Sequence, residues 1–266
     1  MLAILLNIFK VCAFIYVLIL VLLYFFQEKL IFHPSKIPND YIFNFPPRPE
    51  ELTFKTQDNT LLHGILLKAD SSKGLIFYLH GNGGTVASWG EIAHTYTTEN
   101  YDVFMLDYRG YGKSEGSIFS EKQLHEDVQL VYDKLKEKYS EDKIIILGYS
   151  MGSGMATKLA TKSNAKLLIL QAPYYSLKDL VSHYIAFVPT FILKYKLETN
   201  KVLPQCKMPV VIFHGTKDEV IYYESSLKLQ KLFKEKDTLI LLNGQSHNNM
   251  SENPQYLKEI EKILRK

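Results

Sequence analysis

Short, almost continuous apolar runs alternate with longer helical patterns along most of this chain, and this alternation limits the possible folds more than any other feature. The apolar runs cover residues 74–79, 102–107, 143–147, 166–170, 209–213 and 238–242. The helical patterns cover residues 86–97, 120–139, 151–161, 177–195, 221–233 and 254–264. A strand that is covered on both faces is apolar throughout, so the runs predict a parallel sheet between layers of helices.

The segment before these runs predicts an antiparallel start to the sheet. Residues 51–56 and 61–68 are typical of two hairpin strands, which turn at Asp58, Asn59 and Thr60. Together the patterns predict an α/β fold with a mainly parallel, eight-stranded sheet.

The composition limits the class of protein. The chain has 266 residues, 47% hydrophobic and 22% charged, which suits one sizeable globular core and fits neither the disordered nor the fibrous class. Its net charge of +3 comes without a basic run, so we expect no nucleic-acid partner. Two cysteines, Cys12 and Cys206, are too few for a disulfide framework or a cysteine-based zinc site. We expect no cofactor and no metal.

Residues 2–26 form an apolar stretch in which Lys10 is the one charged residue. About 20 apolar residues in a helix cross a hydrocarbon core of about 30 Å. We therefore expect residues 1–28 to be an uncleaved single-pass membrane anchor and residues 29–266 to be one globular domain. A cleaved signal peptide is the main alternative, but residues 24–27, Tyr-Phe-Phe-Gln, are bulky where its cleavage site would lie. Charges flank the stretch on both sides, so its orientation stays open.

A candidate nucleophile lies between a predicted strand and a predicted helix. Residues 148–152 are Gly-Tyr-Ser-Met-Gly. The G-x-S-x-G pattern is weak evidence alone, but a nucleophile elbow needs this setting: a strand, a sharp turn at the serine, flanking glycines and an immediate helix. Ser150 is therefore the predicted nucleophile. The alternative is a glycine-rich turn whose serine caps a helix.

A serine hydroxyl needs a base that takes its proton and an acid that orients the base. After such an elbow the acid precedes the histidine in the chain. The histidines that follow Ser150 are His183, His214 and His247. His183 falls in a helical pattern and His214 ends a strand before any acid in a loop. His247 follows the last predicted strand, so it is the predicted base.

The predicted acid is Asp218, in the loop that follows the strand at residues 209–213. Glu219 and Glu224 are the alternative acids. Each of these carboxylates would otherwise be a solvated loop residue or a helix cap.

An attacked carbonyl develops a negative oxygen that needs backbone N–H donors. The first predicted donor is Met151, directly after the nucleophile. The second is Asn82, in residues 80–84, His-Gly-Asn-Gly-Gly, with Gly83 as its alternative. This loop resembles a phosphate-binding loop in its glycines, but it lacks the Lys-Ser/Thr of a P-loop and the spacing of G-x-G-x-x-G.

These motifs, with residues 106–114 (Leu-Asp-Tyr-Arg-Gly-Tyr-Gly-Lys-Ser), 214–218 (His-Gly-Thr-Lys-Asp) and 246–249 (Ser-His-Asn-Asn), resemble those of the α/β-hydrolase superfamily. The resemblance is to its membrane-anchored, small-cap serine hydrolases and covers nearly all of residues 29–266. It implies that Ser150 is the nucleophile, Asp218 the acid and His247 the base. It also implies that residues 107–114 form a structural loop near the site. Ser246 departs from the small residue that the family often has before its histidine.

Residues 176–203 form a short insertion that we expect to be a small cap. Its residues 183–193 are strongly apolar and contain no Asp, Glu, Lys or Arg. They fit either a helix packed on the body or an apolar rim that admits acyl chains near a bilayer. We expect a serine esterase or thioesterase that acts on uncharged acyl substrates of short to medium chain length. The alternative is a membrane-tethered interaction protein on a hydrolase scaffold.

Overall fold

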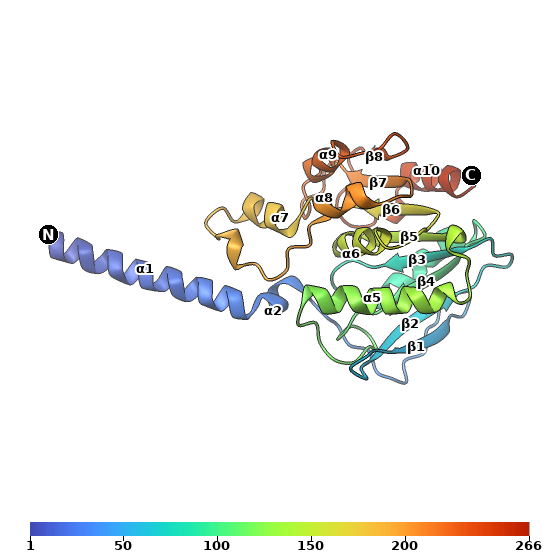
Figure 1. The fold of residues 1–266 in the computed structure, drawn as a ribbon, viewed down its shortest axis with the longest axis horizontal. Helices are drawn as coiled ribbons and strands as arrows, with labels where there is room; N and C mark the ends of the chain where they lie inside the picture. The colour runs from blue at the N-terminus through green and yellow to red at the C-terminus, as the bar shows by residue number, and fades with distance from the viewer. Residues whose placement is uncertain (266) are drawn as a thin grey trace.

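The computed structural model describes residues 1–265. Its centre is a mixed sheet of eight strands (Figure 1). The strands are β1 (Glu50–Lys55), β2 (Leu61–Leu67), β3 (Leu75–Leu79), β4 (Asp102–Leu106), β5 (Ile144–Tyr149), β6 (Leu167–Gln171), β7 (Val210–Gly215) and β8 (Thr238–Leu242). Their order is β1-β2-β4-β3-β5-β6-β7-β8; β2 pairs antiparallel with β1 and β4, and the other pairs are parallel. The predicted α/β fold with an antiparallel start is confirmed.

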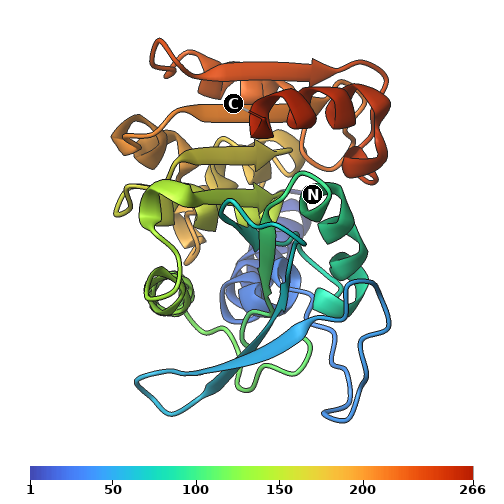
Figure 2. The same cartoon turned by 90° about the vertical axis from the view of Figure 1, so that its right-hand side faces the viewer.

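Helices cover both faces of the sheet (Figure 2). The helices after the anchor segment are α3 (Val86–Trp89), α4 (His94–Thr97), α5 (Glu121–Lys136), α6 (Met151–Ala160), α7 (Leu177–Tyr184), α8 (Thr199–Val202), α9 (Glu224–Gln230) and α10 (Pro254–Leu264), of which α7 lies in the cap and not on the sheet. Side chains of β3 alternate between two cores: Phe77 and Leu79 share one with α5 and α6, whereas Ile76 and Tyr78 share the other with α3, α4 and α10. Both faces of the central strands are therefore apolar.

Three predicted helices differ from the observed ones, and one of them, predicted over residues 221–233, is only shorter, Glu224–Gln230. Over residues 86–97 the helix is interrupted by a 3₁₀ turn, Gly90–Ala93. Gly90 is a poor helix former, and a Cβ on it would lie 2.2 Å from the ring of Phe45. The helix predicted over residues 177–195 ends at Tyr184, because Pro189 further along lacks the N–H that a helix needs. The rest of the cap is loop and 3₁₀ turn as far as the short helix α8.

A long N-terminal helix, α1 (Leu2–Phe25), extends away from the globular body (Figure 1). Its 24 residues give a length of about 36 Å at 1.5 Å per residue. The mean hydropathy of its most apolar window is 2.6. By length and composition α1 is a candidate membrane span, although a signal sequence has the same properties. A short helix, α2 (Gln27–Ile31), joins it to the body.

Candidate active site

Ser150 stands in a strained turn between β5 and α6. Its backbone has φ +50° and ψ −115°, which is rare for a residue with a side chain. The flanking glycines make this turn fit. A Cβ on Gly148 would lie 2.5 Å from the carbonyl oxygen of Gly152, and a Cβ on Gly152 would lie 2.1 Å from the carbonyl oxygen of Leu79. The turn directs the serine away from the sheet at the start of a helix, as an elbow requires.

The three residues predicted as nucleophile, base and acid lie in contact. His247 Nε2 lies 3.0 Å from Ser150 Oγ, and His247 Nδ1 lies 2.7 Å from Asp218 Oδ2. An ionised carboxylate accepts but does not donate, so the proton is on Nδ1 and the lone pair of Nε2 faces the serine hydroxyl. All three side chains are buried. This geometry allows the imidazole to take the proton of the hydroxyl.

Both oxygens of Asp218 are held by donors. Oδ1 accepts from the backbone N–H groups of Val220 (2.9 Å) and Ile221 (2.8 Å). Oδ2 lies 3.2 Å from His214 Nε2 as well as near His247. Burial by itself raises the pKa of Asp218, but the hydrogen bonds from His214 and His247 outweigh it and hold the pKa well below its ordinary value. The carboxyl group is therefore ionised at neutral pH.

His214 belongs to this group of side chains, although the sequence predicted no role for it. It is fully buried at the end of β7. Its Nε2 donates to the carbonyl oxygen of Ile221 (2.8 Å), and its Nδ1 accepts from Ser226 Oγ (2.6 Å). The histidine does not reach Ser150; it fixes the loop that carries Asp218. The one sequence feature that could have indicated this role is its position two residues before the Thr-Lys-Asp segment that contains Asp218.

Tyr149 makes a further contact that the sequence did not indicate. Its hydroxyl donates to the backbone carbonyl of His247. Tyr149 directly precedes Ser150. Tyr149, next to the predicted nucleophile, therefore holds the loop of His247 in place.

The predicted oxyanion donors Asn82 and Met151 line the same cavity as Ser150. The side chain of Asn82 is tied to the chain that leads to α1. Its Nδ2 donates to the carbonyl oxygen of Ile31 (2.6 Å), and its Oδ1 accepts from the His33 backbone N–H (3.0 Å) and the Tyr111 hydroxyl (2.8 Å). These bonds position the loop that carries the Asn82 N–H. The sequence motif identified the loop, but not these partners.

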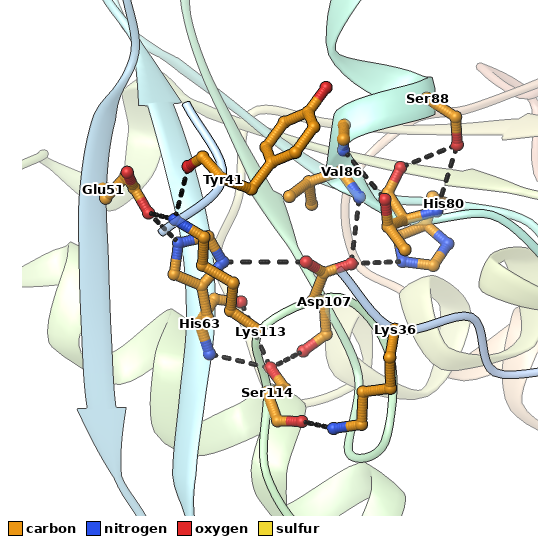
Figure 3. Close-up of polar contacts among 12 residues, drawn as sticks. Lys36, Tyr41, Glu51, His63, His80, Val86, Ser88, Asp107, Lys113 and Ser114 are labelled. Atoms are coloured by element: carbon orange, nitrogen blue, oxygen red, sulfur yellow. Dashed lines mark hydrogen bonds and ion pairs between the residues drawn. The ribbon is translucent and has the colours of Figure 1, made fainter. Parts of the chain in front are cut away.

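A buried polar cluster around Asp107 lies next to the loop that contains Asn82 (Figure 3). Asp107 is fully buried, accepts from the Val86 backbone N–H at 2.9 Å, and lies between His63 (3.6 Å) and His80 (3.8 Å). Burial lowers the pKa of His80 more than the nearby Asp107 carboxylate raises it. Ser114 Oγ donates to the Asp107 carbonyl oxygen at 2.6 Å. Asp107 thus joins the start of α3 to the loop after β4, close to the loop of the predicted oxyanion donor Asn82.

The cavity at Ser150 has a volume of about 540 Å³, within the usual range for ligand pockets. Its walls come from the oxyanion loop, the elbow, the cap and the end of α1. The lining residues include Ile19, Leu23, Asn82, Ser150, Met151, Leu180, Val181, Ile185, Phe187, Val188, Ile192 and Val220. Nearly all of them are apolar, so the cavity suits an uncharged hydrocarbon chain. A larger groove of about 1000 Å³ runs along α5 among charged residues and does not include Ser150.

Within residues 1–265 no group of three or more His, Cys, Asp and Glu side chains is arranged to hold a metal ion. The alternative acids Glu219 and Glu224 are exposed to solvent, whereas Asp218 is the carboxylate in contact with His247.

The chain is similar to several known proteins. A family model described as serine aminopeptidase, S33, matches residues 70–198. The chain is 30% identical over 217 residues to protein bem46 of Schizosaccharomyces pombe, covering 75% of this chain and 72% of bem46. It is 27% identical over 214 residues to alpha/beta hydrolase domain-containing protein 17C of Mus musculus, covering 78% and 65%. The solved esterase Pf2001 of Pyrococcus furiosus matches with a TM-score of 0.70 and 18% identity over 88% of this chain and 97% of that one, a likeness of fold.

Proposed function

This chain belongs to the α/β-hydrolase superfamily, and from that premise we propose that it is a membrane-anchored serine hydrolase. Its substrates are carboxylic esters or thioesters with uncharged acyl groups. The observation that carries the proposal is the continuous chain of contacts from Ser150 Oγ through His247 to Asp218, which opens into an apolar cavity.

In the proposed reaction, Ser150 Oγ attacks the carbonyl carbon of the substrate while His247 Nε2 takes the hydroxyl proton. The carbonyl oxygen becomes negative and is stabilised by the backbone N–H groups of Met151 and Asn82. The tetrahedral intermediate collapses, and the alcohol or thiol leaves with the proton from His247. Water then attacks the acyl-serine, again with His247 as base, and releases the carboxylic acid. Asp218 stays ionised throughout and stabilises the imidazolium that forms twice.

The lining of the cavity supports the proposed substrate class. The cap residues that face it carry no charge, and burial of an acyl chain contributes about 0.8 kcal/mol per CH₂. A charged acyl group would lose its hydration there without a partner. The proposed membrane attachment is supported by α1, in which no residue is buried and most apolar side chains are exposed.

The proposal is tested with the full-length chain in detergent, a fluorophosphonate probe and a p-nitrophenyl ester. We expect the probe to label wild type and not Ser150→Ala, because only an activated serine reacts. Ester turnover should fall by orders of magnitude in Ser150→Ala and His247→Ala. Circular dichroism of each variant checks that the fold is kept.

Near wild-type turnover in Ser150→Ala would show that Ser150 is not the nucleophile. A wild-type chain that neither labels nor hydrolyses any ester or thioester would instead favour an interaction protein on a hydrolase scaffold. Parallel assays of esters and thioesters of equal chain length separate the two bond types.

A further inference from the structure

We propose that the acyl pocket opens sideways into the bilayer, along α1, and that its substrates are esters whose long acyl chain already lies among the lipids. The inference rests on the proposed function and adds a substrate class and an entry route to it. Three observations support it. Side chains of α1 line the pocket, hydrogen bonds join the cap to α1, and the first charged residues after the two apolar segments pair with each other.

The end of α1 forms part of the pocket that contains Ser150. Ile19 and Leu23, four residues apart and thus on one face of the helix, both line it, and so does Gln27 just beyond. An anchor that only tethers the protein would have no side chains in the site. Here an acyl chain bound at Ser150 contacts the same helix that lipid chains surround.

Hydrogen bonds fasten the cap to this helix. The Gln27 side chain, which is buried, donates to the carbonyl oxygen of Ile192 (2.8 Å) and accepts from the Lys194 backbone N–H (2.9 Å). Further up the helix, the hydroxyl of Tyr16 donates to the carbonyl oxygen of Phe187 (2.8 Å). The cap therefore lies alongside the last turns of α1, as Figure 1 shows.

The depth of the cap follows from the spacing along α1. Tyr16 precedes the end of the helix at Phe25 by about 14 Å at 1.5 Å per residue. One leaflet of a hydrocarbon core of about 30 Å has a similar depth. If α1 spans the bilayer, Phe187 lies among the acyl chains together with Ile19 and Leu23.

The surface chemistry of the cap agrees with that depth. Phe187 is 69% exposed and Phe191 is 86% exposed, which is unfavourable in water and favourable in lipid. The first charged residue after this stretch, Lys194, pairs with Glu28 at 3.3 Å. The first charged residues that follow the apolar parts of α1 and of the cap therefore lie side by side, as expected if both are at one membrane surface.

The position of the triad completes the route. Ser150 lines the same pocket as side chains of α1 and the cap. An acyl chain that slides between these walls brings its ester group up to Ser150 while its methyl end stays on the lipid side. The chemistry needed in a substrate is a long uncharged acyl chain linked to an alcohol or thiol at the membrane surface.

The test uses the full-length chain reconstituted in phosphatidylcholine vesicles, with p-nitrophenyl hexadecanoate dissolved in the bilayer and p-nitrophenyl acetate in the water. In the first arm the hexadecanoate is placed either in the enzyme's own vesicles or in separate enzyme-free vesicles. We expect at least ten-fold faster hydrolysis from the shared bilayer. Equal initial rates would overturn the lateral route, and this arm needs no variant.

The second arm changes the wall of the pocket. Leu23→Trp places a bulky indole in it, and Leu22→Trp is the matched control, because Leu22 is exposed on the same helix and is not a lining residue. We expect the ratio of kcat/KM for hexadecanoate to that for acetate to fall at least about ten-fold in Leu23→Trp, since each displaced CH₂ is worth roughly four-fold. Leu22→Trp should keep the wild-type ratio. Equal ratios in the two variants would show that α1 is no wall of the acyl site.

The two proposals fail differently. If wild type hydrolyses acetate and binds the fluorophosphonate probe but both arms give no difference, the lateral route is wrong and the hydrolase proposal stands. If wild type does neither, both proposals are wrong.

Discussion

Asp218→Asn is the substitution that tests the geometry of the site most directly. Asp218 Oδ1 accepts from the backbone N–H groups of Val220 and Ile221, and Oδ2 accepts from His247 Nδ1 and lies 3.2 Å from His214 Nε2. An asparagine must turn its NH₂ group toward one of these pairs, so a donor then faces two donors. Hydrogen bonds to a charged group contribute about 1.5–3 kcal/mol each, so the loss of one pair costs roughly 3 kcal/mol or more of unfolding free energy. For a domain of this size that lowers Tm by about 6–12 °C.

The effect on catalysis has a different cause. If the asparagine donates to His247 Nδ1, the imidazole proton moves to Nε2, which then no longer accepts the proton of Ser150. The equivalent change in other triads lowers kcat by about 10⁴. We expect a loss of kcat of that size in the ester assay and strongly slowed labelling by the fluorophosphonate probe. Glu219→Gln and Glu224→Gln are the matched controls. The free energy of unfolding of both should stay within about 0.5 kcal/mol of wild type, because these side chains are exposed.

The stability effect also has a defined pH dependence. The pKa of Asp218 is lower in the folded chain than the value of about 4 in an unfolded chain. Its carboxylate therefore stabilises the fold above about pH 4, and that contribution is lost as the pH falls below 4. The Tm difference between wild type and Asp218→Asn should be full at pH 7 and shrink below pH 4. A difference that grows on acidification, or a variant that keeps more than a tenth of wild-type kcat, would refute this account of Asp218.

Two further predictions concern the anchor and the elbow. The full-length chain should stay in the membrane pellet after carbonate extraction at high pH, because α1 is apolar over 24 residues; recovery in the supernatant would exclude a spanning helix. Gly152→Ala should destabilise the fold by about 1–3 kcal/mol and reduce activity, because its Cβ would meet the Leu79 carbonyl oxygen at 2.1 Å. Its control, Gly244→Ala, meets no atom within 4 Å and has only the strain of a φ of +72°, about 1 kcal/mol; thermal unfolding of both variants measures the contrast.

The sequence determined the sheet and the loops that carry the chemistry. The core strands are buried on both faces, so their apolar runs stand out from the helical patterns without knowledge of the fold. The candidate site residues Ser150, Asp218 and His247 come three to five residues after such runs, and parallel strands end at one edge of the sheet. Strand ends therefore predicted which residues would meet, and Ser150, Asp218 and His247 do lie in contact.

The breaks in helices were harder to predict. The turn at Gly90 depends on the ring of Phe45, which belongs to a distant irregular segment. Helical periodicity over residues 86–97 contains no information about that neighbour. Local pattern predicts that a segment is helical, whereas packing decides where the helix is interrupted.

The tertiary structure alone decided how α1, the cap and the loop of Asn82 meet. Gln27 and Ile192 are 165 positions apart, and Asn82 and Ile31 are 51 apart. Such hydrogen bonds leave no periodic pattern, because they depend on where two separately folded segments come together in space. The sequence therefore predicted an apolar anchor and an apolar cap as separate features. Only the folded chain brings them together as two walls of one pocket.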